Sequence, residues 1–409
     1  MPRFFEARQM VLDRIVKLPT REVPLGEALG RAVAQDLHAV DPVPPFTNSA
    51  MDGFALRAVD VVGAAADAPV RLRVSGELAA GQTATGPVDP GSVLRIMTGA
   101  PMPEGADAMV PLEWTRHEAD WVEVSRPLLA GANVRQVGED IPRGGLVVAA
   151  GASLGPGEIG VLAATGFARV PVIAAARVAI ITTGDELVDC GTRPGPGQIR
   201  DANLPALCAQ ISTFGATPVS FARIPDRRAQ VEAAIRGALA SADMILTTGG
   251  VSVGDWDFVK PVLEDLGAEP IFWRVDQKPG GPLGFWMFEG KPIFGIPGNP
   301  VAAMVMVEEY VRPALRRMMG FRHLHRPECA ALLDTPWRKS SPDGRVHFLR
   351  AVLREEDGRR RAALTGPQGS GILSSMLRAN ALALIPEDQD AIEAGGAVRL
   401  HLTGLPEDH

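Results

Sequence analysis

Three segments in the middle of the chain share one layout, in which a short apolar run ends in a polar loop that contains glycine. They are residues 181–186 (ITTGDE), 246–255 (LTTGGVSVGD) and 295–300 (GIPGNP). In an open parallel sheet, the loops at the carboxyl ends of the strands form the ligand-binding crevice. Glycine lets the backbone of such a loop approach a ligand closely. The three loops together predict one crevice, although each loop alone could be an ordinary strand-to-helix turn.

The sequence around these loops alternates between strand and helix patterns. Val231, Ile235 and Leu239, for example, recur at helical spacing. Strands that alternate with helices are typical of a parallel sheet covered by helices on both faces, and we therefore expect a three-layer α/β domain. The expected strands are 177–182, 218–222, 244–246 and 293–296, and the expected helices are 203–214, 227–240, 258–266 and a stretch from 301 onward.

The rest of the chain favours β structure, so that the fold class is α/β and β multidomain. A length of 409 residues suggests two to four domains. The start of the chain predicts an amphipathic helix at 5–18, with Val11, Leu12, Ile15 and Val16 on one face. The expected domains are a discontinuous N-terminal domain (1–45 plus 141–176), an inserted β-rich domain (46–140), the α/β domain (177–326) and a small β-barrel-like domain (327–409).

Composition excludes several classes of partner. The 41 Lys and Arg residues against 48 Asp and Glu residues give a net charge of −7, which offers no general attraction to nucleic acid or to an anionic membrane. The longest uncharged run, 202–222, contains prolines and polar residues, unlike a bilayer span. The three cysteines are odd in number and far apart, as expected in a reducing compartment. We therefore expect a cytoplasmic protein.

The crevice loops carry residue types that bind phosphate and Mg²⁺. Asn299 is a suitable helix N-cap and Pro300 suits the first helical position, so the next helix would direct free N–H groups at the crevice. Mg²⁺ binds a few carboxylate oxygens together with substrate phosphates and water. For the aspartates among the candidates, helix capping is the alternative. The candidate carboxylates are Asp185, Glu186, Asp226, Asp255 and Asp257.

Two further regions could supply cations to an anionic ligand. Lys278 lies in the segment KPGGP (278–282), although a Gly/Pro-rich segment is also typical of a plain turn. In the last domain, Arg345 and Arg350 could bind an oxyanion together with the loop at 366–371, because arginine offers a planar fork of donors. The alternative is that both arginines are solvated on a β-sheet surface.

Eight motifs occur in order along almost the whole chain. They are PPFTNSAMDGFA (44–55), GELAAG (76–81), RIMTGAPMPEGADAMV (95–110), GEDI (138–141), AIITTGDELV (179–188), TTGGVSVGDWDFVK (247–260), FGIPGNPVAA (294–303) and GPQGSGILSSMLRAN (366–380). In combination they closely resemble the molybdopterin molybdenumtransferase family, whose members catalyse the last step of basic molybdenum-cofactor synthesis. The resemblance runs from about residue 5 to residue 405.

The resemblance implies a fold and a reaction. Family members are elongated four-domain homodimers, and their α/β domain resembles the molybdopterin-binding fold of the pterin-adenylylating enzyme, which is the expected upstream partner. The reaction inserts molybdate into adenylylated molybdopterin and releases AMP with the help of Mg²⁺. It takes place in a cleft between the α/β domain of one subunit and the N-terminal half of the other.

The resemblance also implies the residues of the site. The polar active-site set consists of Asp52, Thr98, Asp140, Glu186, Asp226 and Asp257, of which Asp226 and Asp257 are the expected Mg²⁺ ligands. The implied molybdate pocket consists of Lys278, Pro282, Arg350 and Ser370. The implied substrate-binding loops contain Gly249, Gly250, Ser252, Gly254, Asp255, Pro297, Gly298 and Asn299.

One position departs from the family pattern. The family hairpin commonly reads KPGKP, whereas Gly281 leaves this chain with one cation fewer, so Lys278 and Arg350 must carry more of the charge.

Two alternative functions are compatible with parts of the sequence. The first alternative is a nucleotidyltransferase that uses the α/β domain alone, which would not require the N-terminal motifs. The second is a non-enzymatic scaffold like the terminal domain of gephyrin, but we expect neither a fused adenylylating domain nor a long linker in this protein.

Overall fold

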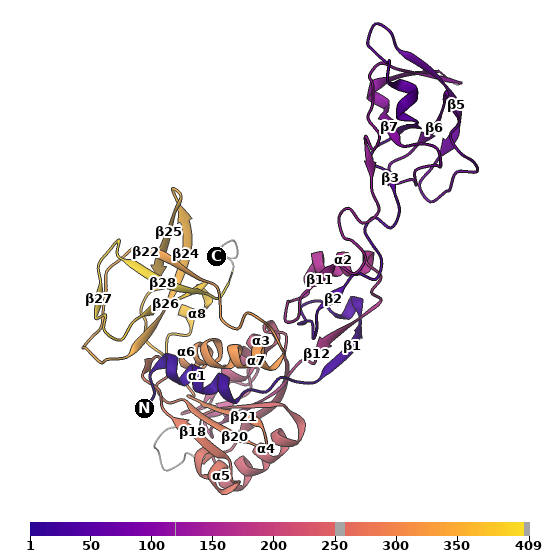
Figure 1. Ribbon diagram of the computed structural model, residues 1–409. Coiled ribbons are helices and arrows are strands. Elements are labelled where there is room, and N and C mark those ends of the chain that lie inside the picture. Colours follow the sequence, from indigo (N-terminus) through magenta and orange to yellow (C-terminus); the bar gives the residue numbers. More distant parts are fainter. Residues whose placement is uncertain (119, 250–257, 405–409) are drawn as a thin grey trace.

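The structure is a computed structural model that describes residues 1–118, 120–249 and 258–404. It is elongated: an α/β domain and a β-barrel pack together at one end, and a β-rich domain forms the other end (Figure 1). The chain starts beside the α/β domain, runs out along β1 (Thr20–Pro24) and returns along β12 (Arg169–Ile173), which pairs antiparallel with β1. The β-rich domain is therefore an insertion between two halves of one connecting region.

The α/β domain is built on a six-stranded sheet with the order β16-β13-β17-β21-β20-β18. The first four strands in this order are parallel, whereas β20 and β18 are antiparallel. The expectation of a wholly parallel sheet is therefore wrong at one edge, because the two-residue turn between β20 and β21 can join only antiparallel strands. The strands are β13 (Arg177–Thr183), β16 (Thr217–Ile224), β17 (Met244–Thr248), β18 (Glu269–Trp273), β20 (Gly284–Phe288) and β21 (Lys291–Ile296).

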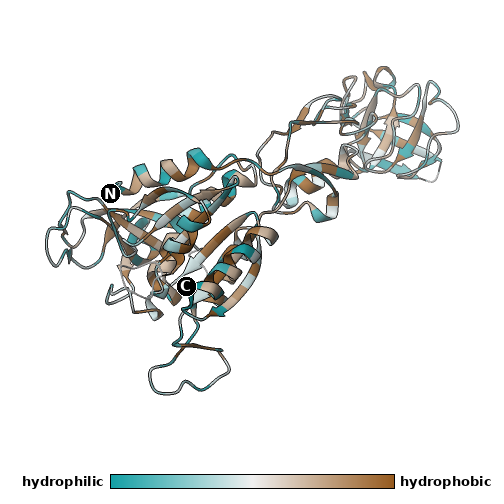
Figure 2. Cartoon of the chain, turned by 90° about the horizontal axis from the view of Figure 1, so that it is seen from below, coloured by the Kyte–Doolittle hydropathy of each residue, from teal (hydrophilic) through white to brown (hydrophobic). Residues whose placement is uncertain are grey.

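Helices cover both faces of this sheet, as the alternating pattern predicted. Successive residues of β13 point to opposite faces, so Ile180 packs into one apolar cluster and Ile181 into the other. Figure 2 shows the apolar residues concentrated along these strands, with mixed polar and apolar residues on the helices. One face carries α1 (Phe4–Arg14), α3 (Asn203–Thr213), α6 (Pro300–Met306) and α7 (Arg312–Met318), and the other carries α4 (Arg228–Ser241) and α5 (Val259–Asp265).

The N-terminal helix is shorter than its sequence pattern predicted. α1 ends at Arg14, and Ile15 already has extended backbone angles (φ −83°, ψ 124°). Val11, Leu12 and Ile15 are buried as expected, but Val16 is 70 % exposed and does not belong to the apolar face. The reason is that a change of backbone conformation at Ile15 ends the helical periodicity on which the expectation for Val16 rested.

The C-terminal region forms a closed five-stranded barrel, since β24 pairs with both β25 and β26. A short strand from the α/β domain, β19 (Gln277–Lys278), pairs in parallel with β24 and places Lys278 opposite His347. This pairing joins the α/β domain to the barrel. The barrel strands are β22 (Glu328–Leu333), β24 (Val346–Glu356), β25 (Arg359–Leu364), β26 (Ala381–Ile385) and β28 (Ala397–Leu402), with β23 (Trp337–Arg338), β27 (Ala391–Ile392) and helix α8 (Ser374–Leu377) beside them.

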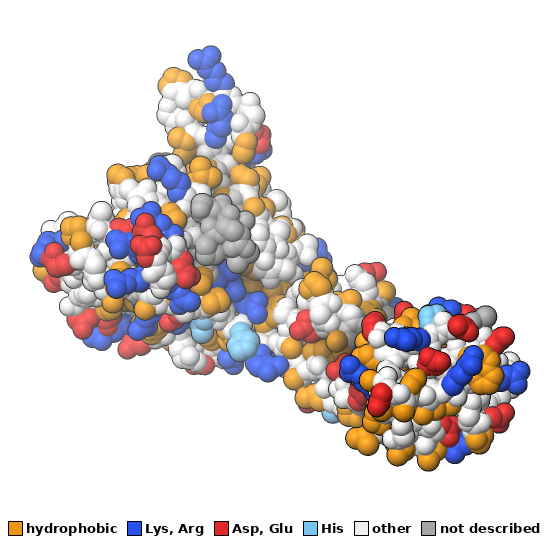
Figure 3. Space-filling model, turned by 90° about the horizontal axis from the view of Figure 1, so that it is seen from above, with side chains coloured by type: hydrophobic (Ala, Val, Ile, Leu, Met, Phe, Trp, Pro, Cys, Tyr) orange, Lys and Arg blue, Asp and Glu red, His pale blue; other side chains and the backbone are white. Residues whose placement is uncertain are grey.

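The distal end of the molecule is a six-stranded sheet with the order β7-β4-β6-β5-β9-β8. Figure 3 shows acidic and basic side chains interspersed over this domain. Its strands are β4 (Gly53–Leu56), β5 (Val70–Leu78), β6 (Ser92–Ile96), β7 (Ala108–Pro111), β8 (Thr115–Glu118) and β9 (Trp121–Val124). The connecting region adds β2 (Leu37–His38) with β11 (Leu146–Val148), β3 (Asn48–Ser49) with β10 (Val134–Arg135), and helix α2 (Pro156–Ala164).

A π-helical segment, Val307–Val311, connects α6 to α7 and directs two acidic side chains into the protein. Glu309 is 3 % exposed; its carboxylate accepts a hydrogen bond from His401 of the barrel at 2.8 Å and lies 3.6 Å from Arg8 of α1. Glu308 forms an ion pair with Arg326 at 2.5 Å. These buried ion pairs join α1, the α/β domain and the barrel. Among the described residues, no helix is long and apolar enough to cross a membrane.

Candidate functional site

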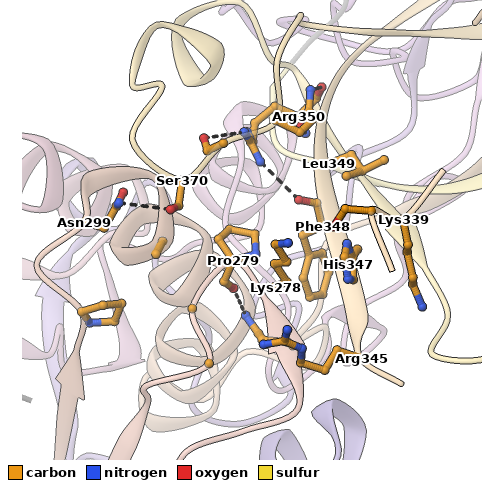
Figure 4. A pocket seen from close by; sticks show the side chains of 18 of the residues that line it. Lys278, Pro279, Asn299, Lys339, Arg345, His347, Phe348, Leu349, Arg350 and Ser370 are labelled. Atoms are coloured by element: carbon orange, nitrogen blue, oxygen red, sulfur yellow. Dashed lines mark hydrogen bonds between the residues drawn. The ribbon is translucent and has the colours of Figure 1, made fainter. Parts of the chain in front are cut away.

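A cavity of about 530 Å³ lies between the α/β domain and the barrel. Separate stretches of chain line it: the segment around β19, the loop that follows β21, the barrel segments around β23 and β24, and the segment before α8 (Figure 4). Six of the residues expected to bind substrate line this one cavity. They are Lys278, Pro282, Pro297, Asn299, Arg350 and Ser370.

Asn299 links the two domains at the cavity wall. It occupies the N-cap position of α6 as expected, but its side chain does not cap the helix. Its Nδ2 instead donates a hydrogen bond to the Oγ of Ser370 at 3.1 Å (Figure 4). Its Oδ1 is buried and has no hydrogen-bond partner among the described residues. The residue thus serves the contact between the loop after β21 and the barrel rather than the helix end.

Arg350 is the most unusual cation of the cavity, because its side chain is fully buried. Its Nε donates to Ser375 Oγ at 3.0 Å and its Nη2 donates to the carbonyl of Gly369 at 3.1 Å. Among the described residues, no carboxylate lies within ion-pair distance of it. Burial lowers the pKa of Arg350 to about 10. A buried cation without a counter-ion is energetically costly, and an anion in the cavity would offset that cost.

The alternative of a solvated surface arginine is therefore wrong for Arg350. Alternation along a strand does not reveal whether a second layer covers its outer face. Here α8 and the segment before it cover Arg350. Arg345 is more exposed, with 39 % of its side chain accessible, and it lies at the same cavity.

A second group of polar residues surrounds the carboxylate of Asp343. Its oxygens lie 3.0 Å from His347 Nε2, 3.2 Å from Arg345 Nη2 and 3.9 Å from Lys339 Nζ. Burial raises the pKa of Asp343, but hydrogen bonds from His347 and Arg345 outweigh this effect and lower it below its usual range. Asp343 therefore holds three basic side chains that line the cavity.

Sequence reasoning missed Lys339 and His347. A signal was present, since Lys339 follows another basic residue, and His347 lies between the two candidate arginines of the same segment. Neither position could be assigned to the cavity, because their place depends on how β24 pairs with β19.

The crevice loops of the α/β domain also meet as predicted. Asn203 Nδ2 donates to Thr248 Oγ1 and to the carbonyl of Gly298, both at 2.8 Å, which connects the end of β17 to the loop that follows β21. Gly249 has a φ of +87°, and a Cβ there would lie 2.6 Å from the carbonyl oxygen of Thr183. Glycine is therefore required where the loop after β17 touches the end of β13.

The acidic candidates in the α/β domain lie at the ends of β13 and β16. Asp185 and Glu186 are exposed, and the backbone N–H of Asp226 donates to Asp185 Oδ1 at 3.4 Å. In the part of the chain that the structure describes, no group of three or more His, Cys, Asp or Glu side chains could hold a metal ion. The candidates Gly250, Ser252, Gly254, Asp255 and Asp257 lie outside the described residues.

The three remaining candidates belong to the distal half of the molecule. Asp52 Oδ1 accepts hydrogen bonds from both the N–H and the Oγ1 of Thr98, each at 2.7 Å, and these bonds lower the pKa of Asp52. Asp140 is exposed in the segment that returns from the β-rich domain. Strands β3 and β6, which precede Asp52 and Thr98, lie far from barrel strand β24 (Figure 1). A single chain therefore does not bring these residues to the cavity.

Comparison with known proteins identifies the family of the chain. The MoeA N-terminal region (domain I and II) matches residues 3–166, a probable molybdopterin binding domain matches 179–317, and the MoeA C-terminal region (domain IV) matches 331–402. Molybdopterin molybdenumtransferase 2 of Mycobacterium tuberculosis (strain ATCC 25618 / H37Rv) is 39% identical over 380 residues, which are 91% of this chain and 92% of the relative. The chain belongs to the molybdopterin molybdenumtransferase family.

Other members of the molybdopterin molybdenumtransferase family agree with this assignment. The Bacillus subtilis enzyme is 35% identical over 387 residues, which are 94% of this chain and 90% of that relative. The crystal structure of the molybdopterin biosynthesis moeA protein from Pyrococcus horikoshii OT3 superposes with a TM-score of 0.84 at 31% identity, over 98% of this chain and 100% of that one. The family and the multidomain fold class expected from the motifs are thus confirmed.

Proposed function

We propose that this chain is a transferase that inserts molybdenum from molybdate into molybdopterin during molybdenum cofactor biosynthesis. The observation that carries the proposal is the fully buried Arg350, which lacks a carboxylate partner among the described residues and lines a basic cavity. The cavity adjoins the region that matches a molybdopterin binding domain, and relatives over most of the chain are named molybdopterin molybdenumtransferase. A tetrahedral dianion such as molybdate would offset the positive charge of this cavity.

In the proposed reaction the substrate is adenylylated molybdopterin, and AMP leaves. Lys278, Arg350 and Ser370 bind the oxyanion, while the glycine-containing loops after β17 and β21 hold the nucleotide phosphates with backbone N–H groups. No covalent protein nucleophile is required, because holding the two substrates in reacting geometry and balancing their charge account for the catalysis.

Asp185 and Asp226 lie together where β13 and β16 end, since the N–H of Asp226 donates to Asp185 Oδ1 at 3.4 Å. A Mg²⁺ that keeps its waters needs only one or two protein carboxylates beside substrate phosphates. Asp226 would hold it together with Asp257, as the resemblance to the family implies, and Glu186 belongs to the same expected active-site set. When bound, the ion supplies positive charge to the phosphate oxygens of the departing nucleotide.

The direct test is to incubate the full chain with molybdate and adenylylated molybdopterin, with and without Mg²⁺, and to measure cofactor formation and AMP release. The proposal expects both products, and expects both to depend on molybdate. AMP release that does not depend on molybdate would contradict it, and adenylylation of molybdopterin by ATP would favour a nucleotidyltransferase.

Restoring the lysine of the family hairpin is expected to strengthen oxyanion binding. A Cβ at Gly281 would lie 3.7 Å from its nearest neighbours, so the Gly281→Lys variant should fold normally. An added cation at the cavity edge should tighten molybdate binding about fivefold, as measured by calorimetry.

Two variants serve as controls for this prediction. Gly281→Gln adds a side chain without charge and should keep the wild-type affinity. Gly280→Ala should instead cost roughly 1–3 kcal/mol of stability, because Gly280 has a φ of +96° and its Cβ would lie 2.5 Å from Met306. Equal affinities of the Gly281→Lys and Gly281→Gln variants would show that the position does not face the anion.

We also propose that the enzyme is a cytoplasmic homodimer, supplied by a pterin-adenylylating enzyme, whose site combines the cavity of one subunit with Asp52, Thr98 and Asp140 of the other. The support is that these residues carry family motifs yet lie far from the cavity of their own chain. The three free cysteines fit a reducing compartment.

Complementation between two inactive variants tests the shared site. Asp52→Ala and Arg350→Met damage opposite halves, so mixed dimers contain one intact site and one doubly damaged site. After subunit exchange of an equal mixture, about a quarter of the wild-type turnover should return. A mixture that remains inactive, although mass spectrometry shows mixed dimers, would place both residues in one subunit's site.

A further inference from the structure

His347 is a buried titratable group in the wall of the anion cavity to which the proposed function gives no role. It is 5 % exposed and lines the cavity beside Lys278, with which it forms a pair between β24 and β19 (Figure 4). Its Nε2 lies 3.0 and 3.2 Å from the two carboxylate oxygens of Asp343. A carboxylate accepts hydrogen bonds, so Nε2 carries the proton of the neutral ring.

The other ring nitrogen is available to a ligand. Nδ1 has no hydrogen-bond partner among the described residues. The ring of Trp337 packs edge-on against His347 at 5.4 Å between centroids and holds its orientation. When the ring is protonated, Nε2–H still donates to Asp343, and a new Nδ1–H becomes available to an oxygen atom in the cavity.

The charges around the ring determine its state when the cavity holds no anion. Burial lowers the pKa of His347, Asp343 opposes this effect, and Lys339 and Lys278 lower the pKa further. Arg345 carries another positive charge and contacts the same carboxylate oxygen of Asp343 as His347. Ile385 is the residue that pairs with His347 from β26, and it carries no charge. The ring is therefore neutral near pH 7 until an anion offsets the surrounding positive charge.

The cavity also lacks a cation that the family hairpin commonly has. Gly281 replaces a lysine there, and the carboxylate of Asp343 already offsets much of the charge of Lys339 and Arg345. A dianion therefore meets three cations without an ion-pair partner in the described cavity wall, namely Arg274, Lys278 and Arg350. A protonated His347 would add a further positive charge.

We propose that His347 takes up a proton from solvent when the oxyanion binds and donates Nδ1–H to it, and that Asp343 is the positioning residue that orients the ring. The inference rests on the proposed function, because it concerns the same oxyanion site. It makes affinity depend on pH: between the pKa values of the empty and the loaded site, molybdate binding weakens about tenfold for each unit of rising pH.

The test is calorimetric titration of the full chain with molybdate between about pH 6.5 and 8.5, in two buffers whose ionisation enthalpies differ. Wild-type protein is expected to show a buffer-dependent enthalpy that corresponds to uptake of up to one proton per anion. His347→Gln keeps a donor toward Asp343 and should bind molybdate more weakly, with an affinity and an enthalpy that no longer depend on pH or buffer. His323→Gln changes an exposed histidine outside the cavity and should match the wild type.

The variant Asp343→Asn separates positioning from direct contact. It removes the carboxylate that favours the charged ring, so proton uptake should persist but shift to lower pH. Binding by wild-type protein without proton uptake would overturn the inference and leave the proposed function intact, as would proton uptake that persists unchanged in His347→Gln. If wild-type protein binds no molybdate at any pH, the proposed function fails together with the inference.

Discussion

Replacing Arg350 by methionine is expected to lower kcat/KM for molybdate insertion about 100-fold or more, with little loss of stability. The side chain is buried at the cavity without a carboxylate partner in the described chain, so its charge is available to the anion. Methionine fills a similar volume and removes a buried charge, which offsets the loss of the hydrogen bonds to Ser375 and Gly369. Steady-state rates at varied molybdate and urea unfolding measure the two effects.

Arg354→Met is the matched control for this prediction. Arg354 lies on the same strand, four residues further on, but 53 % of its side chain is exposed, and it pairs with Asp334 outside the cavity. Its replacement should change stability by about 1 kcal/mol or less and leave turnover unchanged. If Arg350→Met kept the wild-type dependence on molybdate, the oxyanion would have to bind elsewhere.

Replacing Glu309 by alanine is expected to destabilise the protein by about 3–5 kcal/mol. The change leaves Arg8, whose side chain is 12 % exposed, buried without an ion-pair partner among the described residues. It also removes the carboxylate beside Nδ1 of His401, whose side chain is 4 % exposed and whose Nε2 keeps Glu328 at 3.3 Å. Because Arg8 belongs to α1 and His401 to the barrel, the loss should loosen the contact of both with the α/β domain. Urea-induced unfolding followed by circular dichroism measures the change in free energy.

Two further variants make the Glu309 prediction specific. Glu309→Gln retains an acceptor for the hydrogen bond from His401 and should lose less stability than the alanine variant. Glu393→Ala breaks an ion pair with Arg338 in which both side chains are more than 70 % exposed, and it should cost less than about 1 kcal/mol. A Glu309→Ala variant as stable as Glu393→Ala would mean that the buried ion pairs contribute nothing net to the junction.

The α/β layers could be predicted because each depends on a local pattern. Apolar runs become strands, and residues at helical spacing, such as Val231 and Ile235, are buried against one face of the sheet. The antiparallel edge was not predicted, because the Gly/Pro-rich segment suggested only a turn. The π-helical segment was also beyond the sequence pattern, since one extra residue in a turn shifts Glu308 and Glu309 to the interior without changing the local composition.

Only part of the candidate site could be predicted, because the sequence shows local patterns but not which strands pair. Lys278, Arg350 and Ser370 were expected from the resemblance to the family, and the structure brings them to one cavity. Their roles stay predictions. His347 and Lys339 lie in no motif, and only the pairing of β19 with β24 places them there. Burial of Arg350 could not be foreseen, because alternation along a strand is the same whether one face or both faces are covered.

The pairing of β19 with the barrel sheet has a consequence for protein engineering. Gln277 and Lys278 belong to the α/β domain by their place in the chain but to the barrel by their backbone pairing. In a chimera whose C-terminal barrel comes from a relative, Lys278 of this chain would therefore pair with the β24 strand of that relative. Such chimeras should fold and function when residues 274–282 are exchanged together with the barrel. The unit to exchange therefore consists of two segments that are separate in the sequence.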